Sequence, residues 1–225
     1  MPEPASPIEI VLATNNPHKV DELRAILGPT PGLLVVGLSD LAARGQGPFH
    51  EPDEHGSNFD QNAAIKALDY ARQTGQLCLA DDSGLEIDAL QGRPGVISSH
   101  YATDGVETGV MREERDEANR VRVLRELEGT PAERRAARFV CVMTLAKPGQ
   151  VLGSSRGTFE GRIGTPPRIP AGDHGFGYDP LFLVAPDFAR TSAELLPAEK
   201  NLRSHRAHAA MQIAQQIHRL IHGAA

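Results

Sequence analysis

The sequence predicts an α/β fold, because strand-like apolar runs alternate along the chain with segments of helical periodicity. Residues 8–13 form an apolar run that leads through a short polar loop into an amphipathic segment over 20–27. A second helix, over 59–74, precedes a short buried strand at 76–80. The run 139–152 contains a strand-like stretch and a Lys-Pro-Gly-Gln turn, which together predict a hairpin.

Further elements follow from local signals. A strongly charged helix is predicted over 111–128, and the last helix is predicted to start near Ser204. The stretch 98–101 is predicted to be extended. A capping-box pattern at 191–194 predicts a short helix, which Pro197 is expected to break.

Composition limits the class of protein. The 225 residues are enough for one large domain or two small lobes, and 40% hydrophobic with 23% charged residues is typical of a soluble protein. The net charge of −6 argues against a surface that coats nucleic acid. Cys78 and Cys141 lie in apolar runs and are expected to be reduced core residues of a cytoplasmic protein. Neither a signal peptide nor a membrane span is expected.

The chain is organised around an acidic stretch, Asp81-Asp82-Ser83-Gly84, at the predicted end of the strand 76–80. In an extended backbone Asp81 and Asp82 point to opposite faces, so at most one of them fills a given cleft unless the chain bends. A carboxylate at a strand end can hold a hard cation or activate water. The alternative is an acidic turn after a core strand.

The loop 14–19 precedes a helix whose signals are clear. Asn16 is a good N-cap and Pro17 occupies the first helical position. A strand, a tight loop and a helix N-terminus together bind phosphate through free backbone N–H groups, although the P-loop pattern is absent. His18 and Lys19 are cations at the positive end of the helix dipole, which a bound anion would stabilise. The alternative is a solvated lysine.

Three other places carry candidate ligand contacts. Lys66 lies near the buried face of the helix 59–74, where it either snorkels or serves function. Phe176 and Tyr178 lie between glycines in a long Gly/Pro-rich loop, and could form a stacking platform or pin the loop to the core. Cations also lie at the start of the last helix, as they do at the start of the helix that follows the loop 14–19. The two sites together suggest a polyanionic ligand that is bound from two sides.

One motif resembles a catalytic site but lacks the structural context that such a site requires. Residues 153–157 match G-x-S-x-G, the nucleophile elbow of serine hydrolases. The elbow requires a helix after the serine, and the residues that follow, 158–163, are predicted to be extended.

Five stretches together resemble the inosine triphosphate pyrophosphatase family, also called the Ham1/RdgB-like XTP/dITP diphosphatases. They occur in the family's order and span most of the chain: 11–19, 59–67, 80–85, 176–180 and 193–206. Asp-Asp-Ser-Gly-Leu, Phe-Gly-Tyr-Asp-Pro and Ser-His-Arg are highly specific in combination.

The resemblance implies one domain over 1–225, with a mixed, strongly bent central sheet, flanking helices and two lobes that enclose a nucleotide cleft. It implies a homodimer that hydrolyses ITP, dITP and XTP to the monophosphate and pyrophosphate with Mg²⁺, cleansing the nucleotide pool. Neither nucleic acid nor membrane is an expected partner. Rival interpretations are a Maf-like nucleotide pyrophosphatase that acts on other bases, and a nucleotide-sensing module without catalysis.

The family's site residues carry over by position. Asp82 would be the general base or a metal ligand, and Ser83 would contact the nucleotide. The triphosphate would be held by Thr14, Asn15, Asn16, Pro17, His18 and Lys19, with Lys66 nearby, and the purine by Phe176, Gly177, Tyr178, Asp179, Lys200, His205 and Arg206. His205 and Arg206 can donate to a 6-keto oxygen, whereas adenine presents a donor there.

The chain departs from the family's pattern at two positions. Gln61 stands where the family usually has Glu, and His100 stands where it often has Arg. Asp53 and Glu54 are therefore the expected substitutes as metal ligands beside Asp82.

Overall fold

The computed structural model describes residues 7–222, which form a mixed α/β fold around a six-stranded sheet with the order β2-β1-β3-β4-β5-β6. The pairs β1–β2 and β1–β3 are parallel, and β5–β6 is antiparallel. The strands are β1 (Ile8–Leu12), β2 (Leu33–Gly37), β3 (Cys78–Ile87), β4 (Ala136–Lys147), β5 (Gln150–Ile163) and β6 (Phe182–Val184).

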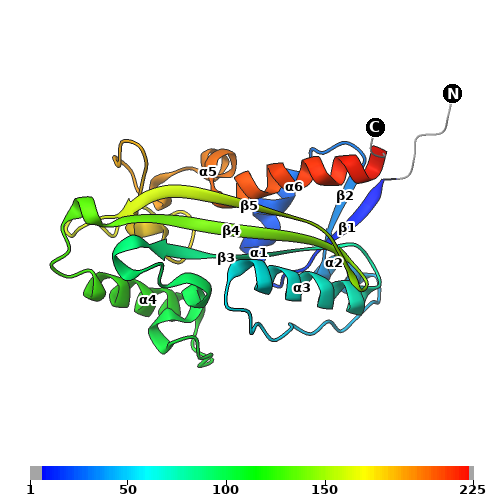
Figure 1. Cartoon of the computed structure of the whole chain (residues 1–225), viewed down its shortest axis with the longest axis horizontal. Coiled ribbons are helices and arrows are strands. Elements are labelled where there is room, and N and C mark those ends of the chain that lie inside the picture. The colour runs from blue at the N-terminus through cyan, green and yellow to red at the C-terminus, as the bar shows by residue number, and fades with distance from the viewer. Residues whose placement is uncertain (1–6, 223–225) are drawn as a thin grey trace. The chain divides into compact units, whose positions relative to one another are not determined.

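Helices flank these strands (Figure 1). The α-helices are α1 (Pro17–Leu27), α2 (Leu38–Ala43), α3 (Phe59–Thr74), α4 (Arg112–Glu126), α5 (Pro197–Arg203) and α6 (His205–His222). The 3₁₀ segments are η1 (Asp88–Leu90), η2 (Gly95–Thr103), η3 (Ala132–Arg134), η4 (Asp179–Leu181) and η5 (Ser192–Glu194). None of the described helices is both long enough and apolar enough to cross a membrane.

The chain divides into two compact units. The first contains the described residues up to Asp82 together with 141–157 and the chain from Arg206 onward, and the second contains 83–140 and 158–205. The strands β3, β4 and β5 each pass from one unit into the other.

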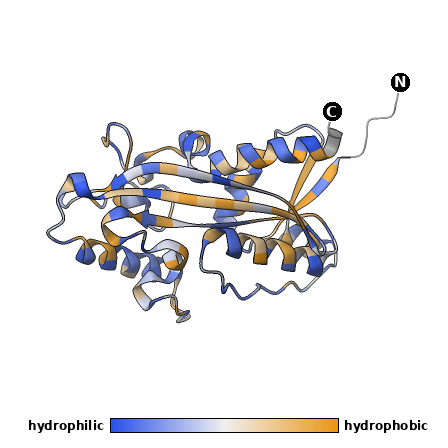
Figure 2. Cartoon of the chain, viewed as in Figure 1, coloured by the Kyte–Doolittle hydropathy of each residue, from blue (hydrophilic) through white to orange (hydrophobic). Residues whose placement is uncertain are grey.

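The first unit has helices on both faces of its strands, and the alternation of side chains along β1 explains why. Ile10 and Leu12 join an apolar cluster with residues of α1 and α6, whereas Val11 and Ala13 join a second cluster with residues of α2 and α3. A strand covered on both faces is predominantly apolar, and in β1 the one charged residue is Glu9. Figure 2 accordingly shows hydrophobic colour along most of β1 and β2.

The second unit has its own apolar core, which includes Leu85, Tyr101, Val123 and Phe182. The helix α4 contributes little to it, because its buried positions are Asn119 and Val123. Some of its polar residues contact other elements instead, among them Asn119, which bonds to the backbone of Ser99 and Ala102.

Several predicted elements are confirmed. The helix predicted over 59–74 has those bounds as α3, with Asn58 accepting a hydrogen bond from the backbone of Gln61 and Gly75 in the left-handed conformation at the C-terminus. The hairpin is confirmed as β4 and β5, and the capping box at 191–194 is present. The hydrolase-like motif 153–157 lies inside β5, where Ser155 Oγ donates to the carbonyl of Ala209 at 2.8 Å, so no nucleophile elbow forms.

Three predictions are wrong. The strand that begins at Cys78 does not end before Asp81 but continues to Ile87. The stretch 98–101 is not extended, because Ser98 Oγ accepts from the Leu85 N–H and donates to the Gly95 carbonyl within η2. Pro197 does not end a helix but begins α5, where its missing N–H costs nothing.

Candidate active site

The loop before α1 is built by side chains that bond to their own backbone. Thr14 Oγ1 accepts from the N–H of Asn16 at 3.2 Å, and Asn16 Oδ1 accepts from the N–H of His18 at 3.1 Å. Pro17 is the first helical residue, as the sequence predicts. Asn15, Pro17 and His18 are exposed, which leaves the helix start open to a ligand.

The acidic pair lies on β3, just beyond the point where its parallel neighbour ends. β1 pairs with β3 at Leu12 and Leu79, the last residue pair of that ladder. Leu79 belongs to the apolar cluster with α1 and α6, and Ala80 belongs to the cluster with α3. By alternation, Asp81 faces α1 and α6 and Asp82 faces α3. The prediction that the two carboxylates point to opposite faces is confirmed by their contacts.

Asp82 is held by the buried lysine of α3. Lys66 Nζ donates to Asp82 Oδ1 at 2.9 Å and lies 3.0 Å from Glu54 Oε2. The second oxygen of Asp82, Oδ2, is buried and has no hydrogen-bond partner among the described residues. Asp82, Glu54 and Lys66 therefore form one group in which a buried carboxylate oxygen has no hydrogen-bond partner among the described residues.

The charged residues of this group shift one another's pKa values. Burial by itself lowers the pKa of Lys66, but the carboxylates of Asp82, Glu54 and Asp81 outweigh it and raise the pKa of Lys66, so the side chain stays an ammonium. Burial raises the pKa of Glu54, and the charge of Asp82 adds to that rise against the opposing effect of Lys66. An ammonium cannot accept a proton, so a proton acceptor in this group is a carboxylate.

Asp81 forms a second, separate group on the other face of β3. Lys19 Nζ lies 3.0 Å from Asp81 Oδ2, and Arg206 Nη2 donates to the same oxygen at 3.3 Å. Arg206 Nη1 also donates to Glu22 of α1. The side chains of Asp81 and Arg206 are each 1% exposed, so this network is a buried one.

The buried network fixes the protonation of its members. Burial alone raises the pKa of Asp81, but Lys19 and Arg206 outweigh it and hold that pKa well below its usual range. Burial lowers the pKa of Arg206, and Asp81 and Glu22 more than reverse that effect. Asp81 is therefore a carboxylate with two cationic partners, which suits positioning better than proton transfer.

This lowered pKa predicts a pH dependence of stability. The carboxylate form of Asp81 stabilises the fold fully above its unfolded-state pKa of about 4, and the contribution is lost as the pH falls below that value. We expect Asp81→Asn to reduce the acid slope of the unfolding free energy by up to ~1.4 kcal/mol per pH unit between about pH 4 and pH 2. Urea unfolding across that range measures the slope. The control is Asp60→Asn, an exposed carboxylate paired with Arg156, and an unchanged slope in Asp81→Asn would contradict the prediction.

The aromatic loop of the second unit is fixed by an ion pair. Lys200 Nζ donates to Asp179 Oδ2 at 2.6 Å, and the same oxygen accepts from the N–H of Phe176 at 2.8 Å. Gly175 has φ +79°, and a Cβ there would lie 2.1 Å from Asp179 Oδ2, so glycine is required. Tyr178 is buried and its hydroxyl donates to the carbonyl of Ser98 at 2.8 Å. Tyr178 thus anchors the loop, whereas Phe176 is only partly buried.

Other predicted residues lie outside these groups. Ser83 is the next residue of β3, half-buried, and His205 begins α6 with its ring stacked on Phe139 at 5.2 Å between centroids. Asp53 is exposed, and its carbonyl oxygen lies 3.2 Å from His55 Nδ1.

The two departures from the family pattern have local roles. Gln61 Oε1 accepts from the backbone N–H and hydroxyl of Ser57 at the start of α3. His100 lies in η2, with its ring nitrogens 2.9 Å from Ser99 Oγ and 2.6 Å from Glu107 Oε2.

Sequence reasoning missed several polar residues that the structure brings to these groups. Glu22 lies one turn after Lys19 in α1, and its spacing could have suggested that it faces the same side. Arg112, Asp116 and Arg120 of α4 contact the aromatic loop. Their spacing of four residues indicates that they share one side of the helix. The sequence of a charged helix does not, however, identify the segment that this side contacts.

Comparison with protein families gives a match over most of the chain. Residues 10–216 match the Ham1 family. A dITP/XTP pyrophosphatase of an Exiguobacterium species is 43% identical over 210 residues, which cover 93% of this chain and 97% of the relative. The dITP/XTP pyrophosphatase of Bacillus subtilis is 41% identical over 207 residues, covering 92% and 96%.

Solved structures agree with these matches. A HAM1 protein from Coxiella burnetii superimposes with a TM-score of 0.76 at 38% identity, covering 94% of this chain and 98% of that one. A nucleoside-triphosphatase, or dITP/XTP pyrophosphatase, from Mycobacterium abscessus gives a TM-score of 0.66 at 36% identity, covering 96% and 100%.

Proposed function

The chain belongs to the Ham1 family, and we propose that it is a dITP/XTP pyrophosphatase whose proton acceptor is Asp82. The reaction is hydrolysis of deaminated purine nucleoside triphosphates, ITP among them, to the monophosphate and pyrophosphate. The family match and the relatives support the activity. The observation that carries the role of Asp82 is its oxygen Oδ2, which is buried beside a lysine that stays charged and has no hydrogen-bond partner among the described residues.

The geometry supports different roles for the two carboxylate oxygens of Asp82. Lys66 binds Oδ1 and fixes the carboxylate, while Oδ2 remains able to accept a hydrogen bond from a water molecule. In the proposed step this water attacks the α-phosphorus, its proton passes to Asp82, and the bond to the leaving pyrophosphate breaks. Positioning and charge stabilisation supply most of the acceleration in such reactions.

Mg²⁺ is the cofactor we propose, with Asp82 and Glu54 as its protein ligands. No group of three or more His, Cys, Asp or Glu side chains within residues 7–222 is arranged to hold a metal ion. The residues nevertheless fit Mg²⁺, which is bound by one or two carboxylates together with substrate phosphates and water. Glu54 lies at the site with a side chain 32% exposed, whereas Asp53 is the weaker candidate. When bound, Mg²⁺ neutralises phosphate charge and lowers the pKa of bound water.

The remaining contacts are proposed from the family pattern. The open start of α1, with Thr14, Asn15, Asn16, Pro17 and His18, is proposed to bind the phosphates together with Lys19. The purine is proposed to stack on Phe176, with Ser83, Gly177, Asp179, Lys200 and His205 as neighbouring contacts. Arg206 stays a predicted base contact, although both of its terminal nitrogens bond to carboxylates here.

Two wider properties also stay proposals. We expect a homodimer that acts in the cytoplasm. The two cysteines, Cys78 and Cys141, are free and buried, which supports a reducing compartment.

The test is pyrophosphate release from a panel of nucleotides with and without Mg²⁺. We expect release from dITP, ITP and XTP with Mg²⁺, at rates on the order of 100-fold above those for the four standard deoxynucleoside triphosphates. Release from other bases but not from this set would point to a Maf-like enzyme. Binding of dITP without any turnover would point to a sensing module.

A further inference from the structure

We propose that Asp116 and Arg120 of α4 are positioning residues that clamp the Gly177 peptide and thereby hold Phe176 ready for the purine. The inference rests on the proposed role of Phe176 in base binding. It assigns a function to the charged helix α4, whose side chains are otherwise unexplained by the reaction.

The clamp consists of two hydrogen bonds to one residue. Asp116 Oδ2 accepts from the N–H of Gly177 at 3.0 Å, and Arg120 Nη1 donates to the Gly177 carbonyl at 2.8 Å. Both bonds involve a charged partner, which makes them stronger than neutral ones. Gly177 has φ +60° and follows Phe176 directly. The bond to its N–H restrains the peptide that joins it to Phe176, and the bond to its carbonyl restrains the peptide that follows.

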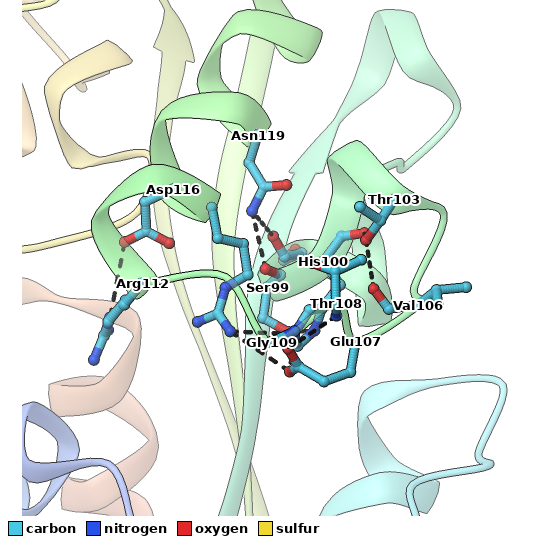
Figure 3. A network of polar contacts seen from close by, with 12 residues as sticks. Ser99, His100, Thr103, Val106, Glu107, Thr108, Gly109, Arg112, Asp116 and Asn119 are labelled. Carbon is cyan, nitrogen blue, oxygen red and sulfur yellow. Dashed lines mark hydrogen bonds and ion pairs between the residues drawn. The ribbon is translucent and has the colours of Figure 1, made fainter.

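A third residue of α4 contacts the ring itself. The guanidinium of Arg112 lies 4.7 Å from the centroid of Phe176, within the range of a cation–π interaction. Arg112, Asp116 and Arg120 are spaced four residues apart and therefore share one side of the helix. Arg112 Nε is also 3.8 Å from Asp116 Oδ2 (Figure 3).

A further contact of α4, made by Asn119, explains why the helix can serve as a rigid support. Asn119 accepts from the N–H of Ala102 at 2.7 Å and donates to the carbonyl of Ser99 at 3.0 Å, so the helix is tied to η2. Figure 3 shows Asn119 directed to Ser99, while Asp116 and Arg112 extend to another side of α4. The clamp residues are partly shielded, with side-chain exposures of 14% for Asp116 and 20% for Arg120.

A fluorescence experiment measures the clamp without reference to activity. The chain has no tryptophan, so Phe176→Trp creates a protein with a single tryptophan, whose emission is excited selectively over that of the three tyrosines. In that background we expect Asp116→Ala and Arg120→Ala to raise the acrylamide quenching constant of the tryptophan about twofold. Asp116→Asn keeps an oxygen that accepts from Gly177, and is expected to restore the parent value. Glu113→Ala removes an exposed acid of the same helix and is the matched control.

The kinetic arm uses the same variants with Phe176 retained. We expect Asp116→Ala and Arg120→Ala to raise KM for dITP about fivefold to tenfold with kcat changed less than about twofold, because they loosen base binding and not the chemistry. Unchanged quenching in both alanine variants would overturn the inference. So would raised quenching with an unchanged KM, provided that Phe176→Ala itself raises KM.

The experiment distinguishes a failure of the proposed base site from a failure of the clamp. If Phe176→Ala leaves KM for dITP unchanged, Phe176 is not the purine platform, whatever the quenching shows. Circular dichroism of each variant establishes that the protein is folded, and Arg120→Ala supplies an independent measurement if Asp116→Ala does not fold.

Discussion

Asp82→Asn is expected to lower kcat for dITP by about a thousandfold or more, with the fold intact. Positioned general bases contribute about 10² to 10⁴ in rate, and an amide neither accepts the proton nor neutralises a cation. The fold should survive, because an asparagine oxygen can still accept the hydrogen bond that Lys66 donates to Asp82 Oδ1. Steady-state pyrophosphate release with Mg²⁺ present measures the loss.

The matched control for this substitution is Asp60→Asn. Asp60 lies on α3, its side chain is 60% exposed, and it pairs with Arg156 on the surface. We expect it to keep wild-type turnover. Near-normal turnover of Asp82→Asn would remove Asp82 from the chemistry and would leave Glu54 as the carboxylate to test next.

The largest expected effect on stability comes from Arg206→Met, which should lower the free energy of unfolding by about 3–5 kcal/mol. Methionine keeps much of the side-chain volume but leaves the buried Asp81 with Lys19 as its one remaining cation among the contacts described above, and it removes the cation that pairs with the partly buried Glu22. Removing one partner from a buried ionic network is costly, whereas the intact network is only weak evidence of net stabilisation.

Urea unfolding followed by circular dichroism measures this change. Arg44→Ala is the control, because Arg44 forms an exposed ion pair with Glu9 and should change stability by less than about 1 kcal/mol. If Arg206→Met unfolds within about 1 kcal/mol of the parent, the network around Asp81 does not carry the energetic role assigned to it.

The parts of the fold that local signals determine could be predicted from the sequence. The helix α3 has its N-cap Asn58 and its C-terminal Gly75 at its own ends, and Asn16 and Pro17 mark the start of α1 in the same way. By contrast, β3 was predicted too short, because Asp81 and Asp82 have low strand propensity. Tertiary contacts supply the burial and partners that keep them in the strand.

The candidate site could be predicted in outline but not in its pairings. The alternation of a strand indicated that Asp81 and Asp82 face opposite sides, and the contacts agree. The pairings depend on which helix covers which face of β3. Lys66 bonds to Asp82, whereas Lys19 and Arg206 contact Asp81. Arg206 lies 184 positions after its partner Glu22, and no local pattern reports such a contact.

The division of Asp81 and Asp82 between the two faces of β3 also limits how this segment can vary during evolution. Substitutions of apolar residues before Asp81 change packing by degrees. A single inserted or deleted residue there would exchange the environments of the two acids, so that each met the other's cations. If Asp82 is the proton acceptor that we propose, the number of residues between Cys78 and Asp82 is therefore expected to stay fixed among relatives that keep the reaction.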